Sequence, residues 1–160
     1  MQDMELLLER LIKHETDFVI VGGFAAVAYG VTLVTQDIDI CFLFSSDNLL
    51  RLQQALKNLN PVHRMTPKRL PLELTAENCK GLKNLYLSTD WGQIDCLGQI
   101  KGIGGYEDVV RQSDEIELDV GTCRILTIQA LIEAKMAMNR PRDRETVLQL
   151  TAIKEKMPAL

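Results

Sequence analysis

The sequence predicts a mixed α/β fold (α+β), a small β-sheet flanked by helices, in a single domain spanning residues 1–160. Short apolar segments of strand length recur along the chain, and segments with helical apolar spacing separate them. Two pairs of the strand-like segments are joined by short turn sequences typical of hairpins. No repeat, linker or low-complexity segment divides the 160 residues, a length sufficient to bury one core.

In the first half of the chain, apolar spacing and capping residues predict alternating helices and strands. Helices are expected at 2–14, 23–30 and 46–59, and strands are expected at 17–21 and 37–44. The first helix has an apolar side formed by Leu6, Leu7, Leu11 and Ile12. Ser45 and Ser46 are suitable N-caps for the last helix. Its apolar stripe consists of Leu49, Leu52, Leu56 and Leu59.

The second half of the chain predicts two hairpins and three helices. The hairpin strands are expected at 82–88 with 93–97, and at 116–120 with 122–126 around Gly121. The helices are expected at 106–112, at 128–139 after the cap Thr127, and from Pro141 to about 156. The glycines at 102–105 lack G-x-G-x-x-G spacing and follow no convincing strand, so a plain turn is favoured there.

Composition limits the cellular setting and the partners. A net charge of −4 excludes an overall basic surface for non-specific nucleic-acid binding. The four cysteines are dispersed without a C-x-x-C pair, which predicts buried, reduced thiols. The N-terminus has no secretory-signal pattern, and no apolar run approaches the roughly 18 residues of a membrane span. We therefore expect a cytoplasmic protein without membrane association.

One window of the chain is locally basic. Residues 51–72 contain no Asp or Glu, but they contain Arg51, Lys57, His63, Arg64, Lys68 and Arg69. The window could form a phosphate-binding edge. The alternative, which three prolines favour, is that these residues solvate a helix face and the loop after it.

A Gly-Gly pair and two aspartates suit the two ends of a nucleoside triphosphate. Gly22 and Gly23 follow an apolar strand and precede a short helix, where glycine lets the backbone approach a ligand and free N–H groups favour phosphate. Asp37 and Asp39 alternate with apolar residues in the next strand. Their side chains therefore share one face, with Cα atoms roughly 6 to 7 Å apart. Solvent-facing acids on an edge strand are the alternative for this pair.

A third carboxylate would complete a metal site. Asp95 lies in another apolar strand, and pairing of that strand beside Asp37 and Asp39 would bring three carboxylates together. Carboxylates of this kind hold hard cations such as Mg²⁺ or Mn²⁺. Two such ions about 3.5 to 4 Å apart clamp the attacking and leaving oxygens of a phosphoryl transfer.

Gly-Gly, a short helix, Asp-x-Asp and a later Asp resemble the nucleotidyltransferase superfamily of DNA polymerase β. The likeness is greatest to small bacterial members, including the abortive-infection-type nucleotidyltransferase toxins, and it covers roughly residues 16–155. Thr35 matches their Thr-x-Asp-x-Asp, and Lys135 with Arg142 and Asp143 is similar to their helix-borne Lys and Arg/Lys-Asp turn. The chain has Leu33 where many relatives have Arg, and Thr146 where they often have an acid.

The resemblance implies a nucleotidyltransferase-like fold and an enzyme that moves a nucleoside monophosphate from an NTP to an acceptor hydroxyl. Asp37, Asp39 and Asp95 would be catalytic and would hold Mg²⁺ or Mn²⁺. The nucleotide would contact Gly22, Gly23, Thr35 and Lys135. The acceptor could be an RNA end, a protein or a small molecule.

Three simpler interpretations stay open. The chain could be a catalytically weak nucleotide-binding or partner-binding module, for instance within a toxin–antitoxin pair. Lys135 could be a solvated helical side chain. Asp143 could serve only to stabilise a helix dipole.

Overall fold

The computed structural model describes residues 2–157 and confirms the mixed α/β class. Its helices are α1 (Gln2–Lys13), α2 (Gly22–Ala28), α3 (Ser46–Ala55), α4 (Tyr106–Arg111), α5 (Ile128–Met138) and α6 (Asp143–Lys156). Its strands are β1 (Phe18–Val21), β2 (Asp37–Phe42), β3 (Val62–His63), β4 (Asn84–Thr89), β5 (Gly92–Leu97), β6 (Gln99–Ile100), β7 (Gly104–Gly105), β8 (Ser113–Leu118) and β9 (Gly121–Leu126).

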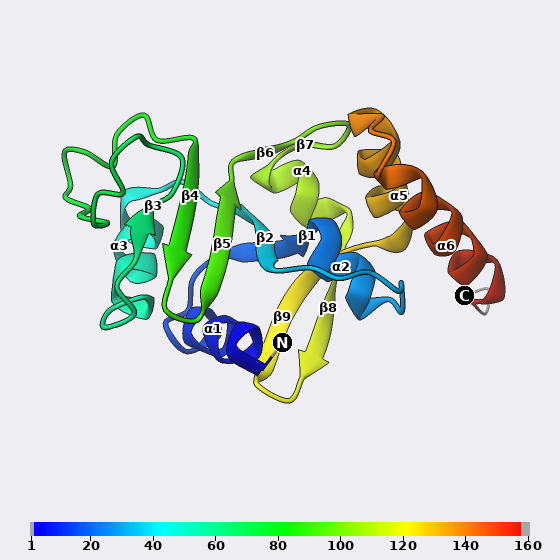
Figure 1. Ribbon diagram of the computed structural model, residues 1–160, viewed down its shortest axis with the longest axis horizontal. Coiled ribbons are helices and arrows are strands. Elements are labelled where there is room, and N and C mark those ends of the chain that lie inside the picture. The colour runs from blue at the N-terminus through cyan, green and yellow to red at the C-terminus, as the bar shows by residue number, and fades with distance from the viewer. Residues whose placement is uncertain (1, 158–160) are drawn as a thin grey trace.

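Within the described residues, seven strands form one mixed sheet in the order β3-β4-β5-β2-β1-β9-β8 (Figure 1). The two predicted hairpins, β4–β5 and β8–β9, are antiparallel, as are β1–β2 and β3–β4. The pairs β2–β5 and β1–β9 are parallel and join segments far apart in the chain. Strand β2 therefore lies in the interior of the sheet, next to β5.

Several predicted boundaries were wrong by a few residues. Helix α3 ends at Ala55 instead of 59, and Asn58 and Asn60 adopt positive φ angles of 71° and 52°, which asparagine tolerates better than most residues. Strand β8 spans Ser113–Leu118 instead of the expected 116–120. Because Leu118 pairs with Gly121, the hairpin turns at 119–120 rather than at Gly121. Helix α6 begins after Pro141, at Asp143.

Three very short strands were not predicted. Strand β3 pairs with β4 in the loop region assigned to the basic window. Strands β6 and β7 form a separate two-stranded sheet, in which residues 101–103 make the expected turn and Gly104–Gly105 form the second strand. Two-residue strands contain too little sequence for an alternating pattern to be recognised.

The alternation in β2 separates the core from the polar face. Ile38 and Ile40 are fully buried, whereas Asp37 and Asp39 on the opposite face are partly exposed. The predicted stripe of α3 is buried throughout. The predicted apolar side of α1 was partly wrong, because Leu6 is 40% exposed. The buried side of α1 consists of Met4, Leu7, Leu8 and Leu11.

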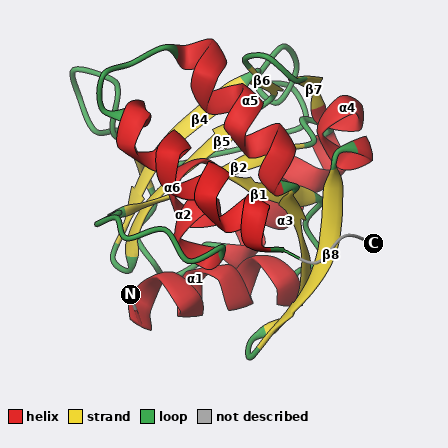
Figure 2. Ribbon diagram, turned by 90° about the vertical axis from the view of Figure 1, so that its right-hand side faces the viewer, coloured by secondary structure: helices red, strands yellow, loops and turns green. Residues whose placement is uncertain are grey.

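The helices lie around the twisted sheet. In Figure 1, α3 lies at the end of the sheet near β3, and α5 and α6 lie at the opposite end. Figure 2 shows α5 and α6 side by side in front of the strands, next to α2. None of the helices in residues 2–157 is long and apolar enough to cross a membrane. All four cysteines are buried and free, as predicted.

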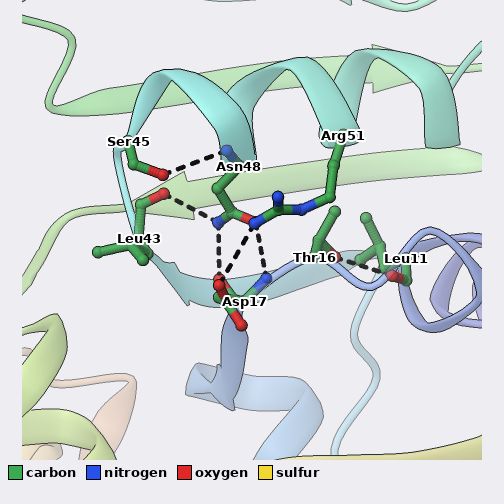
Figure 3. Close-up of polar contacts among 7 residues, drawn as sticks. All are labelled: Leu11, Thr16, Asp17, Leu43, Ser45, Asn48 and Arg51. Atoms are coloured by element: carbon green, nitrogen blue, oxygen red, sulfur yellow. Dashed lines mark hydrogen bonds and ion pairs between the residues drawn. The ribbon is translucent and has the colours of Figure 1, made fainter.

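A buried asparagine joins α3 to the ends of two strands (Figure 3). Asn48 accepts a hydrogen bond from the Asp17 backbone N–H at 2.8 Å. Its amide donates to the Asp17 and Leu43 carbonyls at 3.0 and 2.9 Å. Ser45 caps α3 by accepting from the Asn48 N–H, as its sequence position predicted. This network fixes the start of β1, which leads into Gly22 and Gly23, and the end of β2, which carries Asp37 and Asp39.

Candidate functional site

A cleft of about 920 Å³ lies between the polar face of the sheet and the α5–α6 segment. Strands β2 and β5 supply one wall, and the end of α5 with the turn before α6 supplies the other. All seven predicted site residues line this cleft: Gly22, Gly23, Thr35, Asp37, Asp39, Asp95 and Lys135. The fold therefore brings together residues that the chain separates by more than a hundred positions.

Glycine is required at the β1–α2 turn. Gly22 has a φ of +66°, and a Cβ there would lie 2.9 Å from the Cβ of Asp39 and closer still to its carboxylate. A Cβ on Gly23 would touch Leu33 at 3.4 Å and the Thr35 hydroxyl at 3.5 Å. The turn therefore packs its backbone directly against the Asp39 side chain.

The three predicted carboxylates occur on one face of the sheet. In the parallel β2–β5 pair, Asp39 is the register partner of Asp95, and Asp37 is the partner of Gln93. Register partners on adjacent strands point to the same face, and so do residues two apart on one strand. Asp37, Asp39 and Asp95 therefore all point into the cleft, which is the arrangement expected from the sequence.

The Asp39 carboxyl is the most perturbed of these groups. Its burial, followed by the charges of Asp95 and Asp37, raises its pKa to about 6. Lys135 and Arg64 act in the opposite direction but do not cancel these effects. An acid that resists ionisation because it is buried and lies near other acids is typical of functional sites.

Arg64 neutralises one member of the group. It forms a two-point ion pair with Asp95, in which Nη1 contacts Oδ1 and Nη2 donates to Oδ2 at 3.0 Å. The guanidinium carbon also lies 5.7 Å from the centre of the Tyr86 ring. The side chains of Arg64 and Asp95 are 15% and 13% exposed, so water screens this pair little.

A second charged group lies on the opposite wall. Lys135 Nζ lies 3.3 Å from Asp143 Oδ1, and Arg140 Nε and Nη2 donate to Asp143 Oδ2 and Oδ1 at 2.6 and 3.1 Å. Burial alone would raise the pKa of Asp143, but the Arg140 hydrogen bond and the Lys135 charge outweigh it and lower that pKa. The Lys135 side chain is 11% exposed, so it is not a solvated helical lysine.

The buried Asp143 therefore does more than stabilise a helix dipole. Its carboxylate orients two cations, Lys135 and Arg140, both of which line the cleft. Thr146 is also buried at this wall.

Thr35 and Leu33 occupy the segment between the glycines and the aspartates. The Thr35 hydroxyl donates to the Asp37 carbonyl at 3.2 Å and thereby shapes the entry to β2. Leu33 contributes an exposed apolar side chain to the cleft. Arg64, Arg140 and Arg142 are the arginines that line the cleft.

The donor chemistry of the sheet wall fits a hard divalent cation. Three carboxylates share one face, and carboxylate oxygens are the ligands that such cations prefer. As the side chains stand, however, no three His, Cys, Asp or Glu residues in the range 2–157 form a ready ligand group. In this arrangement Arg64 engages both oxygens of Asp95.

Two site residues were not singled out from the sequence. Arg64 belonged to the basic window, for which a solvated surface was favoured, and the absence of any acid in that window was the available signal. Arg140 belonged to the Arg-Pro-Arg-Asp segment that contributed to the resemblance, but it was given no role of its own. No protein-family model matches the chain, and no curated protein matches it.

Proposed function

We propose that this protein is a metal-dependent nucleotidyltransferase that moves a nucleoside monophosphate from an NTP to an acceptor hydroxyl. The observation that carries the proposal is the register of β2 and β5, in which Asp39 lies directly beside Asp95. With Asp37 on the same face and two cations on the opposite wall, the cleft offers carboxylates for a metal and positive charge for phosphates.

Each wall would contribute a separate part of substrate binding. Asp37 and Asp39, with Asp95, would hold Mg²⁺ or Mn²⁺. Lys135, which Asp143 holds in place, would contact the triphosphate as a charged donor. Gly22 and Gly23 would let the phosphates approach the backbone, and Thr35 would support that turn from the next segment.

The transfer requires one bond to form and one to break. The acceptor oxygen attacks the α-phosphorus, pyrophosphate leaves, and a cleft carboxylate receives the hydroxyl proton. Bound divalent metal would neutralise phosphate charge and lower the pKa of the attacking hydroxyl. The chain itself supplies mostly orientation and fixed charge, which is the principal part of catalysis in phosphoryl transfer.

A specific observation supports a second function. Arg64 occupies both oxygens of Asp95, and Leu33 replaces an expected arginine, so the cleft could bind a nucleotide or a partner without transferring anything. This module could belong to a toxin–antitoxin pair. An RNA end, a protein or a small molecule would be the acceptor under the first function, and none is needed under the second.

The deciding experiment measures transfer of label from each α-labelled NTP, with Mg²⁺, into bacterial RNA and lysate proteins. The wild type is compared with Asp37→Ala/Asp39→Ala and with a control lacking two exposed acids outside the cleft, Glu117→Ala/Asp119→Ala. Thermal unfolding verifies that all three fold. Transfer by the wild type and the control alone supports the enzyme. Nucleotide binding without transfer supports the module, and transfer by the cleft variant rules out the assigned site.

A further inference from the structure

Arg64 is held in the cleft by contacts from two strands. Its backbone N–H donates to the Tyr86 carbonyl at 3.0 Å, its guanidinium lies over the Tyr86 ring, and its fork binds Asp95 on β5. Tyr86 and Asp95 are themselves register partners. The arginine is therefore positioned by the sheet itself, although it follows the two-residue strand β3 in the chain.

Arg64 places a positive charge beside the aspartates of the cleft. Its pKa is raised by the Asp95 hydrogen bond, and the charges of Asp95, Asp37 and Asp39 contribute in that order. The guanidinium is thus the internal counter-ion of the whole carboxylate group. Asp95 takes both of its hydrogen bonds, and Asp39 lies beside Asp95 on the neighbouring strand.

A divalent cation bound to Asp95 would meet the same guanidinium. Both Asp95 oxygens already accept hydrogen bonds from Arg64, so a metal ligand bond must replace or distort at least one of them. A cation held by the carboxylate would also repel the guanidinium across a distance of a few ångströms, in a place that water screens poorly. Pairing with Arg64 and metal binding at Asp95 therefore oppose each other.

We propose that Arg64 is a resident cation that competes with the divalent metal for Asp95. The inference rests on the proposed metal-dependent function, and it identifies the residue that sets the metal affinity of the site. Residues 65–70 after Arg64 are all exposed, so the segment that follows Arg64 lies outside the core. Metal binding then includes the cost of breaking this ion pair.

The test measures Mn²⁺ binding by calorimetry and by the electron paramagnetic resonance of the free ion. Wild type is compared with Arg64→Gln, Arg64→Lys and Asp39→Asn. Arg111→Gln is the matched control, because it breaks an exposed Arg–Asp pair on α4 outside the cleft and changes the net charge equally. Thermal unfolding in chelator establishes that each variant is folded.

Arg64→Gln is expected to tighten Mn²⁺ binding by roughly tenfold or more, since it removes a nearby positive charge from a poorly screened site. Arg64→Lys keeps the charge but loses the two-point contact, so its affinity is expected between those of wild type and Arg64→Gln. Arg111→Gln is expected to bind like the wild type, and Asp39→Asn is expected to lose binding.

Other results would overturn the inference in distinguishable ways. Equal or weaker Mn²⁺ binding in Arg64→Gln would mean that Arg64 does not compete, while the metal site would stand. No Mn²⁺ binding in any variant would remove the metal-dependent function and the inference with it. Should Arg64→Gln not fold, Arg64→Lys decides: tighter binding than wild type supports competition, and unchanged binding refutes it.

Discussion

The carboxyl of Asp39 ties stability to the proposed function at the level of one residue. Its pKa rises from an ordinary value of 3.8 to about 6, because burial and two neighbouring acids disfavour its ionised form. A group whose pKa is higher in the folded state contributes stability when it is protonated. That contribution is complete below about pH 4 and is lost as the pH rises through 6.

Replacing Asp39 with asparagine, an uncharged shape match for the protonated acid, removes this pH dependence. We expect Asp39→Asn to be more stable than wild type at pH 7 by about 1–3 kcal/mol in chelator, a range bounded by the shift of its pKa. The gain should shrink toward zero below pH 4. Urea unfolding between pH 4 and 7.5 measures it.

An exposed acid on the β8–β9 turn provides the control for this comparison. Asp119→Asn changes the formal charge by the same amount outside the cleft and should leave the pH profile of the wild type unchanged. Equal stability of Asp39→Asn and wild type at pH 7 would show that burial and the neighbouring acids do not destabilise the ionised Asp39 carboxyl. A functional site that lowers stability is a common trade-off in proteins.

Glycine is required at position 22 for two reasons, a positive φ angle and close contact with Asp39, and a comparison with Gly81 separates them. Gly22 and Gly81 have φ angles of +66° and +79°, but a Cβ on Gly81 meets nothing within 4 Å. Both alanine variants incur the backbone penalty, of the order of 1 kcal/mol. Only Gly22→Ala also pushes against Asp39.

We expect Gly22→Ala to be destabilised more than Gly81→Ala, by at least about 1–2 kcal/mol, a typical cost of overpacking. It should also weaken Mn²⁺ binding, which Gly81→Ala should leave unchanged. Denaturant unfolding and metal titration of the two variants give the comparison. Indistinguishable variants would show that the turn can move away from Asp39 without cost.

At the scale of elements, Asn48 fastens α3 to the strands that build the site. Its side chain is fully buried and makes three hydrogen bonds with the backbone of Asp17 and Leu43. Removing it leaves the part-buried Asp17 N–H and Leu43 carbonyl without this partner, at a cost of about 1–3 kcal/mol for each group that remains unsatisfied, whereas the Asp17 carbonyl still accepts from the Leu43 N–H.

Asn48→Ala is therefore expected to lower the free energy of unfolding by about 3 kcal/mol or more. Asn78→Ala is the control, because Asn78 also bonds to nearby backbone, through Thr75 and Glu73, but is exposed. Its loss should cost about 1 kcal/mol, as for an exposed cap. Urea unfolding measures the free energy of unfolding of both variants. Equal decreases would mean that the Asn48 network does not stabilise the attachment of α3 to β1 and β2.

The elements also show where sequence reasoning ends. Helix α1, β2 and the two hairpins were predictable because their apolar periods and turns are local. The parallel pairing of β2 with β5 joins residues more than fifty positions apart, so the closeness of Asp39 and Asp95 was predicted only through the resemblance. The pairing of Arg64 with Asp95 was not predictable, because the strand that delivers Arg64 is two residues long.

At the scale of the whole molecule, the cleft is assembled from distant parts of the chain. The carboxylate wall belongs to the middle of the sheet, and the cationic wall belongs to α5 and the turn before α6. Charges of opposite sign thus face each other across one cavity. A ligand that carries both a metal and phosphates, as an NTP does, would satisfy both walls at once.

The variant Lys135→Met tests the cationic wall of the cleft separately from the carboxylate wall. The variant keeps the length of the side chain, and Arg140 still holds Asp143 by two hydrogen bonds, so the fold should persist. We expect NTP affinity to fall by roughly ten- to a hundredfold, the value of a charge-assisted hydrogen bond of about 1.5–3 kcal/mol. Mn²⁺ affinity should be unchanged or slightly tighter, since only a cation has been removed.

Calorimetric titration with Mn²⁺ and with a non-hydrolysable NTP in Mg²⁺ measures both affinities. Lys154→Met, on the exposed part of α6, is the control and should change neither affinity. Asp39→Asn should show the opposite pattern to Lys135→Met, with metal binding lost first. If Lys135→Met binds the NTP as well as the wild type does, the phosphates do not lie between the two walls. The triphosphate would then have to be assigned to the Gly22–Gly23 side of the cleft alone.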